Sequence, residues 1–258
     1  MSKAKLDTAF QTVEEAGEKA FVPYIMAGDG GLDNLNERIR FLAESGATAI
    51  ELGLPFSDPV ADGPTIQAAG IRALEAGTTV QAVLDEVAKE KNNRTVPLVI
   101  MTYLNPIFAY GIEAFASACE AAGISGLILP DLPLEEEGLV MKTLQKHNIA
   151  LIRLVALTST PERIRTLAER SEGFLYAVTV AGTTGERASF VDQIGTHLQA
   201  LKKISKAPVL AGFGVSTPEH VKELSQYCDG VVVGSKIVDA LYRGDKQQVA
   251  DLIASRKY

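Results

Sequence analysis

A glutamate inside an apolar run is the residue whose chemistry packing alone explains least. Glu51 lies between Ile50 and Leu52, and an ionised carboxylate is costly to bury among apolar side chains. A dry pocket would raise the pKa of this carboxyl toward neutrality, which suits general acid–base catalysis. The alternative is a structural carboxylate paired with an arginine of a neighbouring strand, such as Arg153.

A second carboxyl follows eleven positions later, in a segment rich in proline and glycine. Together with Glu51, Asp62 could flank a single substrate. Asp-Gly-Pro is also a common turn sequence. On its own, Asp62 is therefore better explained by a turn.

Glycines follow the last apolar runs at positions suited to an anion. Gly212-Phe213-Gly214 and Gly234-Ser235 each come directly after an apolar run and before a helical pattern. Backbone N–H groups at a helix N-terminus bind phosphate, and glycine lets the backbone approach without a Cβ in the way. We favour a phosphate site over turns alone.

Several apolar side chains could line a pocket beside these groups: Phe21, Leu129, Tyr176 and Phe213. Core packing is the commoner role of a single aromatic residue in a strand. Other kinds of site are not expected. No lysine falls inside an apolar run, which argues against a Schiff base, and the three histidines lie away from the ends of these runs, which argues against a histidine-bound metal.

Eight apolar runs must position these residues, and they alternate with helical patterns about every 30 residues, the size of a βαβ unit. The runs are 21–27, 48–52, 97–102, 126–129, 150–155, 174–180, 208–211 and 230–233. Continuous apolar runs are typical of parallel strands buried on both faces. We predict a single (β/α)₈ barrel domain over residues 1–258, with an extra N-terminal helix at 2–17. A doubly wound open sheet is the alternative, but the regular units and the lack of a dinucleotide fingerprint favour closure.

Local signals place the helices between the runs. Thr160-Pro161 and Thr217-Pro218 each provide an N-cap followed by proline at the first helical position. Apolar periodicity predicts helices at 33–45 and 134–146. The long interval after the second run predicts an enlarged connection. In such barrels the active site lies at the carboxyl ends of the strands, where Glu51 and the glycines fall.

Composition excludes several classes of protein. The chain has 258 residues with 25 Lys+Arg and 32 Asp+Glu, a net charge of −7, so a nucleic-acid partner is not expected. The two cysteines, 109 residues apart, form no metal or disulfide pattern. No apolar run approaches the length of a membrane helix, and the charged first twenty residues do not resemble a signal peptide. We predict a soluble cytoplasmic protein.

The motifs together resemble one family. Residues 51–67, ELGLPFSDPVADGPTIQ, closely resemble the signature of the tryptophan synthase α subunit family. The other matching motifs are Tyr103-Leu104-Asn105-Pro106, Leu129-Pro130-Asp131-Leu132-Pro133, Gly182-Thr183-Thr184-Gly185 and Gly212-Phe213-Gly214-Val215. The resemblance runs from about residue 21 to residue 238. Small departures occur in the 182–185 motif, where Gly-Val-Thr-Gly is commoner, and at Thr179, where serine is frequent.

The resemblance implies a (β/α)₈ barrel lyase of L-tryptophan biosynthesis that cleaves indole-3-glycerol phosphate to indole and D-glyceraldehyde 3-phosphate, by a retro-aldol reaction without a metal or a Schiff base. It implies Glu51 as the general acid–base and Asp62 as the acceptor of the indole N–H. The residues that it implies for the phosphate are Gly185, Gly214, Gly234 and Ser235. Those for the indole pocket are Phe21, Tyr103, Leu129, Tyr176 and Phe213, with Thr184 closing a loop over the site.

The resemblance also implies a partner. The family forms an α₂β₂ complex with a β subunit that carries pyridoxal phosphate and receives indole through a tunnel, and Asp58 and Pro59 resemble the contact surface. No cofactor is expected in this chain. Two other hypotheses are another phosphate-binding barrel, such as an isomerase or indole-3-glycerol phosphate synthase, and a non-catalytic barrel that regulates a partner. The signature at 51–67 and the absence of strand-end lysines argue against the first, and the presence of both carboxyls argues against the second.

Overall fold

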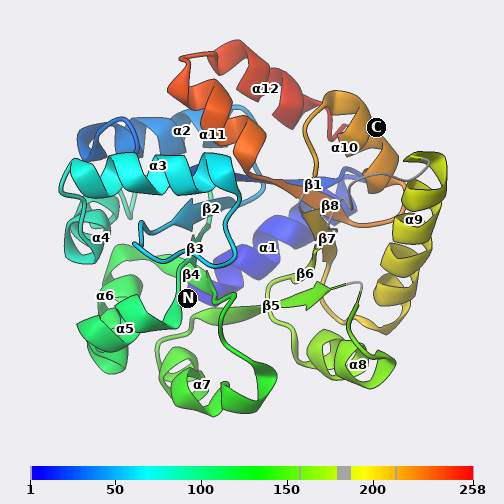
Figure 1. Cartoon of the computed structure of the whole chain (residues 1–258), viewed down its shortest axis with the longest axis horizontal. Helices are drawn as coiled ribbons and strands as arrows, with labels where there is room; N and C mark the ends of the chain where they lie inside the picture. Colours follow the sequence, from blue (N-terminus) through cyan, green and yellow to red (C-terminus); the bar gives the residue numbers. More distant parts are fainter. Residues whose placement is uncertain (1, 157, 179–186, 213, 258) are drawn as a thin grey trace.

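Eight parallel strands close into a barrel in chain order, as the sequence predicts. The computed structural model describes residues 2–156, 158–178, 187–212 and 214–257. The strands are β1 (Ala20–Met26), β2 (Ile50–Gly53), β3 (Leu98–Met101), β4 (Ile124–Ile128), β5 (Ala150–Ala156), β6 (Leu175–Val178), β7 (Val209–Gly212) and β8 (Gly230–Val233). Figure 1 looks along the barrel, with helices surrounding the strands.

The helices lie between and after the strands, with one helix ahead of the first strand. They are α1 (Ser2–Glu15), α2 (Leu35–Glu44), α3 (Pro64–Glu75), α4 (Val80–Lys89), α5 (Leu104–Tyr110), α6 (Ile112–Ala122), α7 (Gly138–Lys146), α8 (Pro161–Arg170), α9 (Arg187–Ile204), α10 (Pro218–Ser225), α11 (Ser235–Tyr242) and α12 (Lys246–Ala254). The connection after β2 carries both α3 and α4, which explains the long interval in the sequence. The helices expected at 33–45 and 134–146 each begin with a short 3₁₀ turn, η1 (Leu32–Asn34) and η2 (Leu134–Glu136).

The N-caps expected from the sequence form. The Thr160 hydroxyl accepts a hydrogen bond from the Arg163 N–H at 3.4 Å, and the Thr217 hydroxyl accepts one from the His220 N–H at 3.3 Å. Each bond satisfies a donor that the first helical turn leaves free. These local signals therefore fix where α8 and α10 begin.

The two faces of each strand belong to different cores. In β1, Val22 and Tyr24 belong to the cluster inside the barrel, whereas Phe21 and Ile25 belong to the cluster between the strands and the outer helices. Successive side chains of a strand point to opposite faces. The position of a residue within its strand therefore decides whether it can reach a site inside the barrel.

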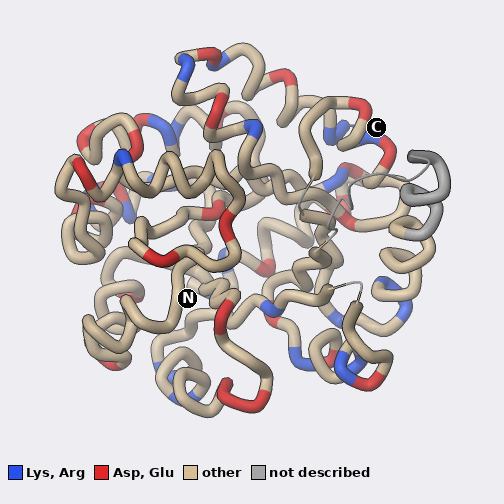
Figure 2. Tube along the Cα trace, in the orientation of Figure 1, with Lys and Arg blue, Asp and Glu red and all other residues tan. Residues whose placement is uncertain are grey.

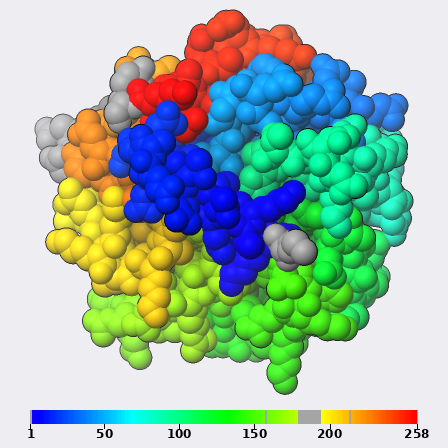
Figure 3. All heavy atoms as spheres, turned by 180° about the vertical axis from the view of Figure 1, so that it is seen from behind, coloured from blue at the N-terminus to red at the C-terminus, as the bar shows by residue number. Residues whose placement is uncertain are grey.

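Helix α1 closes the N-terminal end of the barrel. Leu6 and Phe10 are buried with the inner cluster, and the rings of Phe10 and Phe174 lie 5.5 Å apart. Figure 3 shows α1 crossing the rear face. The opposite end, formed by the carboxyl ends of the strands, is left for a site.

Charge is spread over the outer helices. Figure 2 shows acidic and basic positions interspersed around the barrel, with acidic positions on the segment after β2. Among the described residues, no helix combines the length and apolarity needed to cross a membrane.

Candidate active site

Glu51 points into the carboxyl end of the barrel from β2. Its neighbours Ile50 and Leu52 pack outward against the helices, which places the Glu51 side chain on the inner face. Glu51 is 1% exposed, and its Oε2 has no hydrogen-bond partner among the described residues. A buried carboxyl oxygen without a partner destabilises the fold. A role in a reaction therefore explains Glu51 better than a role in packing.

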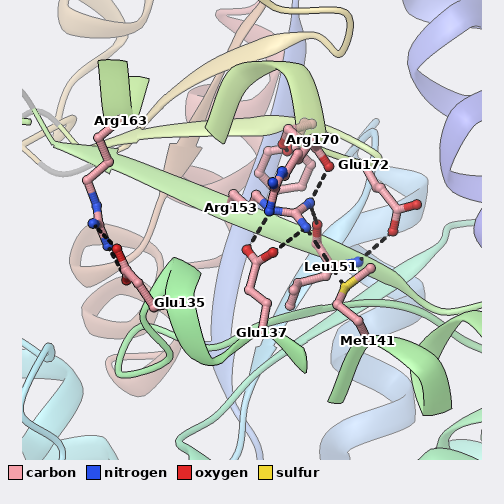
Figure 4. Close-up of polar contacts among 10 residues, drawn as sticks. Glu135, Glu137, Met141, Leu151, Arg153, Arg163, Arg170 and Glu172 are labelled. Carbon is pink, nitrogen blue, oxygen red and sulfur yellow. Dashed lines mark hydrogen bonds and ion pairs between the residues drawn. The ribbon is translucent and has the colours of Figure 1, made fainter. Parts of the chain in front are cut away.

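The structural alternative for Glu51 is wrong, because Arg153 pairs elsewhere. The Arg153 guanidinium donates to both carboxylate oxygens of Glu137, at 2.7 and 2.8 Å. Figure 4 shows this pair on the outer side of β5, between β5 and α7. Arg153 is therefore not the partner of Glu51.

Burial changes the acidity of Glu51. Desolvation, with a smaller contribution from the nearby Asp62 carboxylate, raises the pKa of its carboxyl to about 8. At neutral pH the carboxyl is therefore mainly protonated, as a general acid requires.

Asp62 faces Glu51 from the segment between β2 and α3. The Asp62 N–H donates to the Pro59 carbonyl at 3.3 Å, so the expected turn exists, but the side chain also lines the cavity of Glu51. Burial raises the pKa of the Asp62 carboxyl to about 6, and a hydrogen bond with the Tyr103 hydroxyl opposes the rise. The Tyr103 hydroxyl also accepts the Ala61 N–H at 3.1 Å. Tyr103 thus anchors the Asp62 segment beside the site.

A cavity of about 450 Å³ joins the two carboxyls to the expected anion site. The site residues predicted from the sequence that line it are Glu51, Asp62, Tyr176, Gly214, Gly234 and Ser235. Gly234 is the N-cap residue of α11, and Gly214 has a φ of +83°, in the region that favours glycine. Because N–H groups at a helix N-terminus attract anions, this end of the cavity suits a phosphate group.

Two tyrosines are seated over glycines at the strand ends. A Cβ on Gly53 would lie 1.9 Å from the Tyr24 hydroxyl, and a Cβ on Gly212 would lie 2.2 Å from a ring carbon of Tyr176. Glycine at these two positions therefore lets the rings lie across the barrel mouth. Tyr24 is not among the residues predicted from the sequence, although it lies on the inner face of β1 and is the register partner of Glu51.

Two predicted pocket residues are wrong. Phe21 is fully buried in the outer cluster, at the start of β1, and Tyr24 is the residue of β1 that lines the cavity. Leu129 also belongs to the outer cluster, whereas Ile128 belongs to the inner one. In both cases the chosen residue lies on the wrong face, because a shift of an odd number of residues exchanges the two faces of a strand.

The remaining predicted residues lie at the rim or outside the described part of the chain. Asp58 is exposed and Pro59 half-buried. Thr184, Gly185 and Phe213 lie outside the described residues. Within the described ranges, no group of His, Cys, Asp and Glu side chains could hold a metal ion.

Comparisons with known proteins agree with one another. The model of the family described as "Tryptophan synthase alpha chain" matches residues 10–257. A "Tryptophan synthase alpha chain" from Oceanobacillus iheyensis is 56% identical over 98% of this chain and 97% of its own length. A crystal structure of tryptophan synthase subunit alpha from Legionella pneumophila is 34% identical, with a TM-score of 0.87, over 98% of this chain and 96% of that one. A ligand-free tryptophan synthase structure from Mycobacterium tuberculosis is also 34% identical, with a TM-score of 0.86, over 98% and 99% of the two chains.

Proposed function

Because the chain belongs to the tryptophan synthase alpha chain family, it is an enzyme of L-tryptophan biosynthesis that catalyses the alpha reaction, and we propose that Glu51 and Asp62 perform its chemistry. In this reaction indole-3-glycerol phosphate is cleaved to indole and D-glyceraldehyde 3-phosphate. The observation that carries the assignment is the buried Glu51 carboxyl, whose Oε2 has no partner among the described residues, facing Asp62 in a cavity that ends at the N-terminus of α11.

The cavity accounts for both ends of the substrate. The phosphate would lie at the N-terminus of α11, against the backbone of Gly214, Gly234 and Ser235, where the helix dipole favours negative charge. The indole ring would lie between Tyr24 and Tyr176, which line the same cavity. This placement brings the bond to be broken toward the carboxyls.

The first step is a proton transfer from Glu51 to C3 of the indole ring. The ring becomes a cation, with its positive charge centred on the ring nitrogen. Asp62, as an anion, accepts the hydrogen bond from this N–H and stabilises the charge. A fixed carboxylate beside a developing cation is electrostatic catalysis.

The second step breaks the carbon–carbon bond. The Glu51 carboxylate takes the proton of the hydroxyl on the glycerol carbon that is bonded to the ring. This carbon becomes the aldehyde carbon of glyceraldehyde 3-phosphate. The electron pair of the broken bond returns to the ring and neutralises the cation, which gives indole. Glu51 ends the cycle protonated, as it began.

The acidities of the two carboxyls match these roles. With pKa values of about 8 for Glu51 and about 6 for Asp62, neutral pH leaves Glu51 mainly protonated and Asp62 mainly ionised. Two carboxyls with pKa values held apart by their surroundings can take the roles of acid and of anion.

The assay is indole release from indole-3-glycerol phosphate by the purified chain. Glu51→Gln keeps the size of the side chain but cannot transfer the proton, so we expect kcat to fall by about 10²–10⁴-fold. Glu75→Gln, at an exposed position of α3, is the matched control and should keep the wild-type rate. An unchanged rate in Glu51→Gln, with the variant folded by circular dichroism, would contradict the assignment.

We also propose that the chain works with a β subunit carrying pyridoxal phosphate, in an α₂β₂ complex that receives the indole. Apolar side chains at the rim support a protein contact around Asp58 and Pro59: Val60 is 82% exposed and Phe108, on α5, is 46% exposed. The segment after β2 and the start of α5 are in contact, because the rings of Phe56 and Tyr103 lie 5.4 Å apart.

The complex can be tested by sedimentation of the chain with the β subunit of a close relative. A charge at Val60, in Val60→Asp, should weaken binding at least tenfold, and Ile204→Asp, at the exposed end of α9, should leave it unchanged. Equal binding of both variants would exclude this surface. We place both subunits in the cytoplasm, in agreement with the free, buried thiols of Cys119 and Cys228.

A further inference from the structure

Tyr24 places a buried phenol in the same cavity as both carboxyls of the site. Its side chain is 5% exposed and lines the cavity together with Glu51 and Asp62. It is the register partner of Glu51 on the neighbouring strand, and its hydroxyl lies over Gly53, two residues further along β2. The hydroxyl is therefore directed toward the carboxyl end of the barrel.

The Tyr24 hydroxyl has a weak hydrogen-bond partner. It donates to the thioether sulfur of Met26 at 4.0 Å, and among the described residues the structure gives it no other acceptor. Sulfur of this kind accepts hydrogen bonds poorly, and a buried donor without a good acceptor is destabilising. The phenol therefore gains from a stronger acceptor nearby.

The carboxyls are the strong acceptors in its surroundings. Burial raises the pKa of the Tyr24 phenol well above its ordinary value, and the charges of Asp62 and then Glu51 raise it further. Tyr103 and Tyr176 are the other titratable groups that act on this phenol. Tyr103 already forms a hydrogen bond with Asp62, so Asp62 has phenols from both β1 and the β3–α5 connection close to it.

We propose that Tyr24 is a positioning residue, whose hydroxyl donates a hydrogen bond to the ionised Asp62 carboxylate and so keeps Glu51 the protonated member of the pair. The inference rests on the proposed function, since it explains how two nearby carboxyls keep different charges. A hydrogen bond to the charged form of an acid favours ionisation. Without it, the first ionisation of the pair would need a higher pH.

The test is a titration of the carboxyls by ¹³C NMR, with label in the side-chain carboxyls of Asp and Glu. Resonances are assigned with Asp62→Asn and Glu51→Gln. In Tyr24→Phe, which removes only the hydroxyl, the lower pKa of the pair should rise by about one unit, equal to about 1.4 kcal/mol. Tyr227→Phe, a half-buried tyrosine that packs against Gly195 on α9, is the matched control and should leave both values unchanged.

The inference is overturned if the lower pKa in Tyr24→Phe stays within about 0.2 units of the wild type, or if only the higher value moves. Should Tyr24→Phe not fold, 3-fluorotyrosine at position 24 replaces it. That phenol is a stronger donor, so the lower pKa should then fall. An unchanged lower pKa would overturn the inference.

The titration needs no substrate, so it tests the role of Tyr24 independently of the proposed function. A wild-type chain that released no indole would contradict the proposed function, whatever the titration showed. With an active enzyme, the acid limb of the pH profile of kcat/KM should move upward in Tyr24→Phe by the same amount as the lower pKa. A loss of activity without that movement would indicate a merely structural role.

Discussion

Glu51 and Asp62 line one cavity but lose their protons at different pH values. Glu51 is 1% exposed, and one of its carboxyl oxygens has no partner in the described part of the chain, whereas Asp62 is half-buried and receives a hydrogen bond from Tyr103. Desolvation disfavours the charged form, and a donated hydrogen bond favours it. Their different surroundings therefore make one carboxyl an acid and the other an anion.

This difference predicts a bell-shaped pH profile for kcat/KM, which reports the ionisations of the free enzyme. Activity should rise as Asp62 loses its proton near pH 6 and fall as Glu51 loses its proton near pH 8. The measurement is the initial rate of indole release over about pH 5–9, a range that extends about one unit beyond each of the two pKa values. Asp62→Asn should remove the acid limb along with most of the activity. A profile with no fall on the alkaline side would contradict Glu51 as the acid.

Gly53 should resist substitution, because its missing side chain makes room for Tyr24. In Gly53→Ala the new Cβ would lie 1.9 Å from the Tyr24 hydroxyl, so the ring must move out of the cavity mouth. We expect a loss of about 1–3 kcal/mol of stability from overpacking and at least a tenfold loss of kcat/KM. Gly138→Ala, where a Cβ meets no atom within 4 Å, is the control. Equal kinetics for both variants would show that the position of Tyr24 is unimportant for activity.

At the scale of the elements, periodicity and caps could be predicted from the sequence, but the facing of the strands could not. The eight runs and the caps at Thr160 and Thr217 rest on local signals. All seven residues of β1 are buried, so no polar alternation distinguishes the inner face from the outer. That is why Phe21 was predicted in the pocket instead of Tyr24, and only the closed barrel with its register resolves the choice.

The same limit applied to Arg153, whose partner depends on which helix covers β5. Arg153 and Glu137 have side chains 4% and 10% exposed, and Figure 4 shows their paired contacts. Glu137→Ala would leave a buried guanidinium without its carboxylate, so we expect a loss of about 3–5 kcal/mol of stability. The measurement is urea unfolding followed by circular dichroism.

A matched control lies two residues away. Glu135 pairs with Arg163 at 2.7 Å, but these side chains are 62% and 39% exposed, so Glu135→Ala should cost no more than about 1 kcal/mol. Similar losses in Glu135→Ala and Glu137→Ala would mean that the buried pair adds nothing beyond a surface pair.

At the scale of the whole molecule, the barrel separates the helix that closes its N-terminal end from the proposed active site. Helix α1 packs on the N-terminal ends of the strands (Figure 3), while the carboxyls and α11 meet at the opposite ends. In this fold, residues of the N-terminal face serve stability and the loops of the carboxyl face serve chemistry. Changes at the rear should therefore alter stability without altering the reaction.

Leu6 tests this separation, because it is fully buried and lies close against Gly173, where a Cβ would come within 2.5 Å of its Cδ2. Leu6→Ala should cost about 2–5 kcal/mol, the range for removing a large buried side chain, because it leaves a void between α1 and the strands. Glu14→Ala, at an exposed position of the same helix, should change stability little.

Below the unfolding transition, kcat/KM of the folded Leu6→Ala enzyme should stay within about twofold of the wild type, since the rear of the barrel does not touch the cavity. A large loss of kcat/KM in a fully folded Leu6→Ala enzyme would show that the two ends of the barrel are coupled.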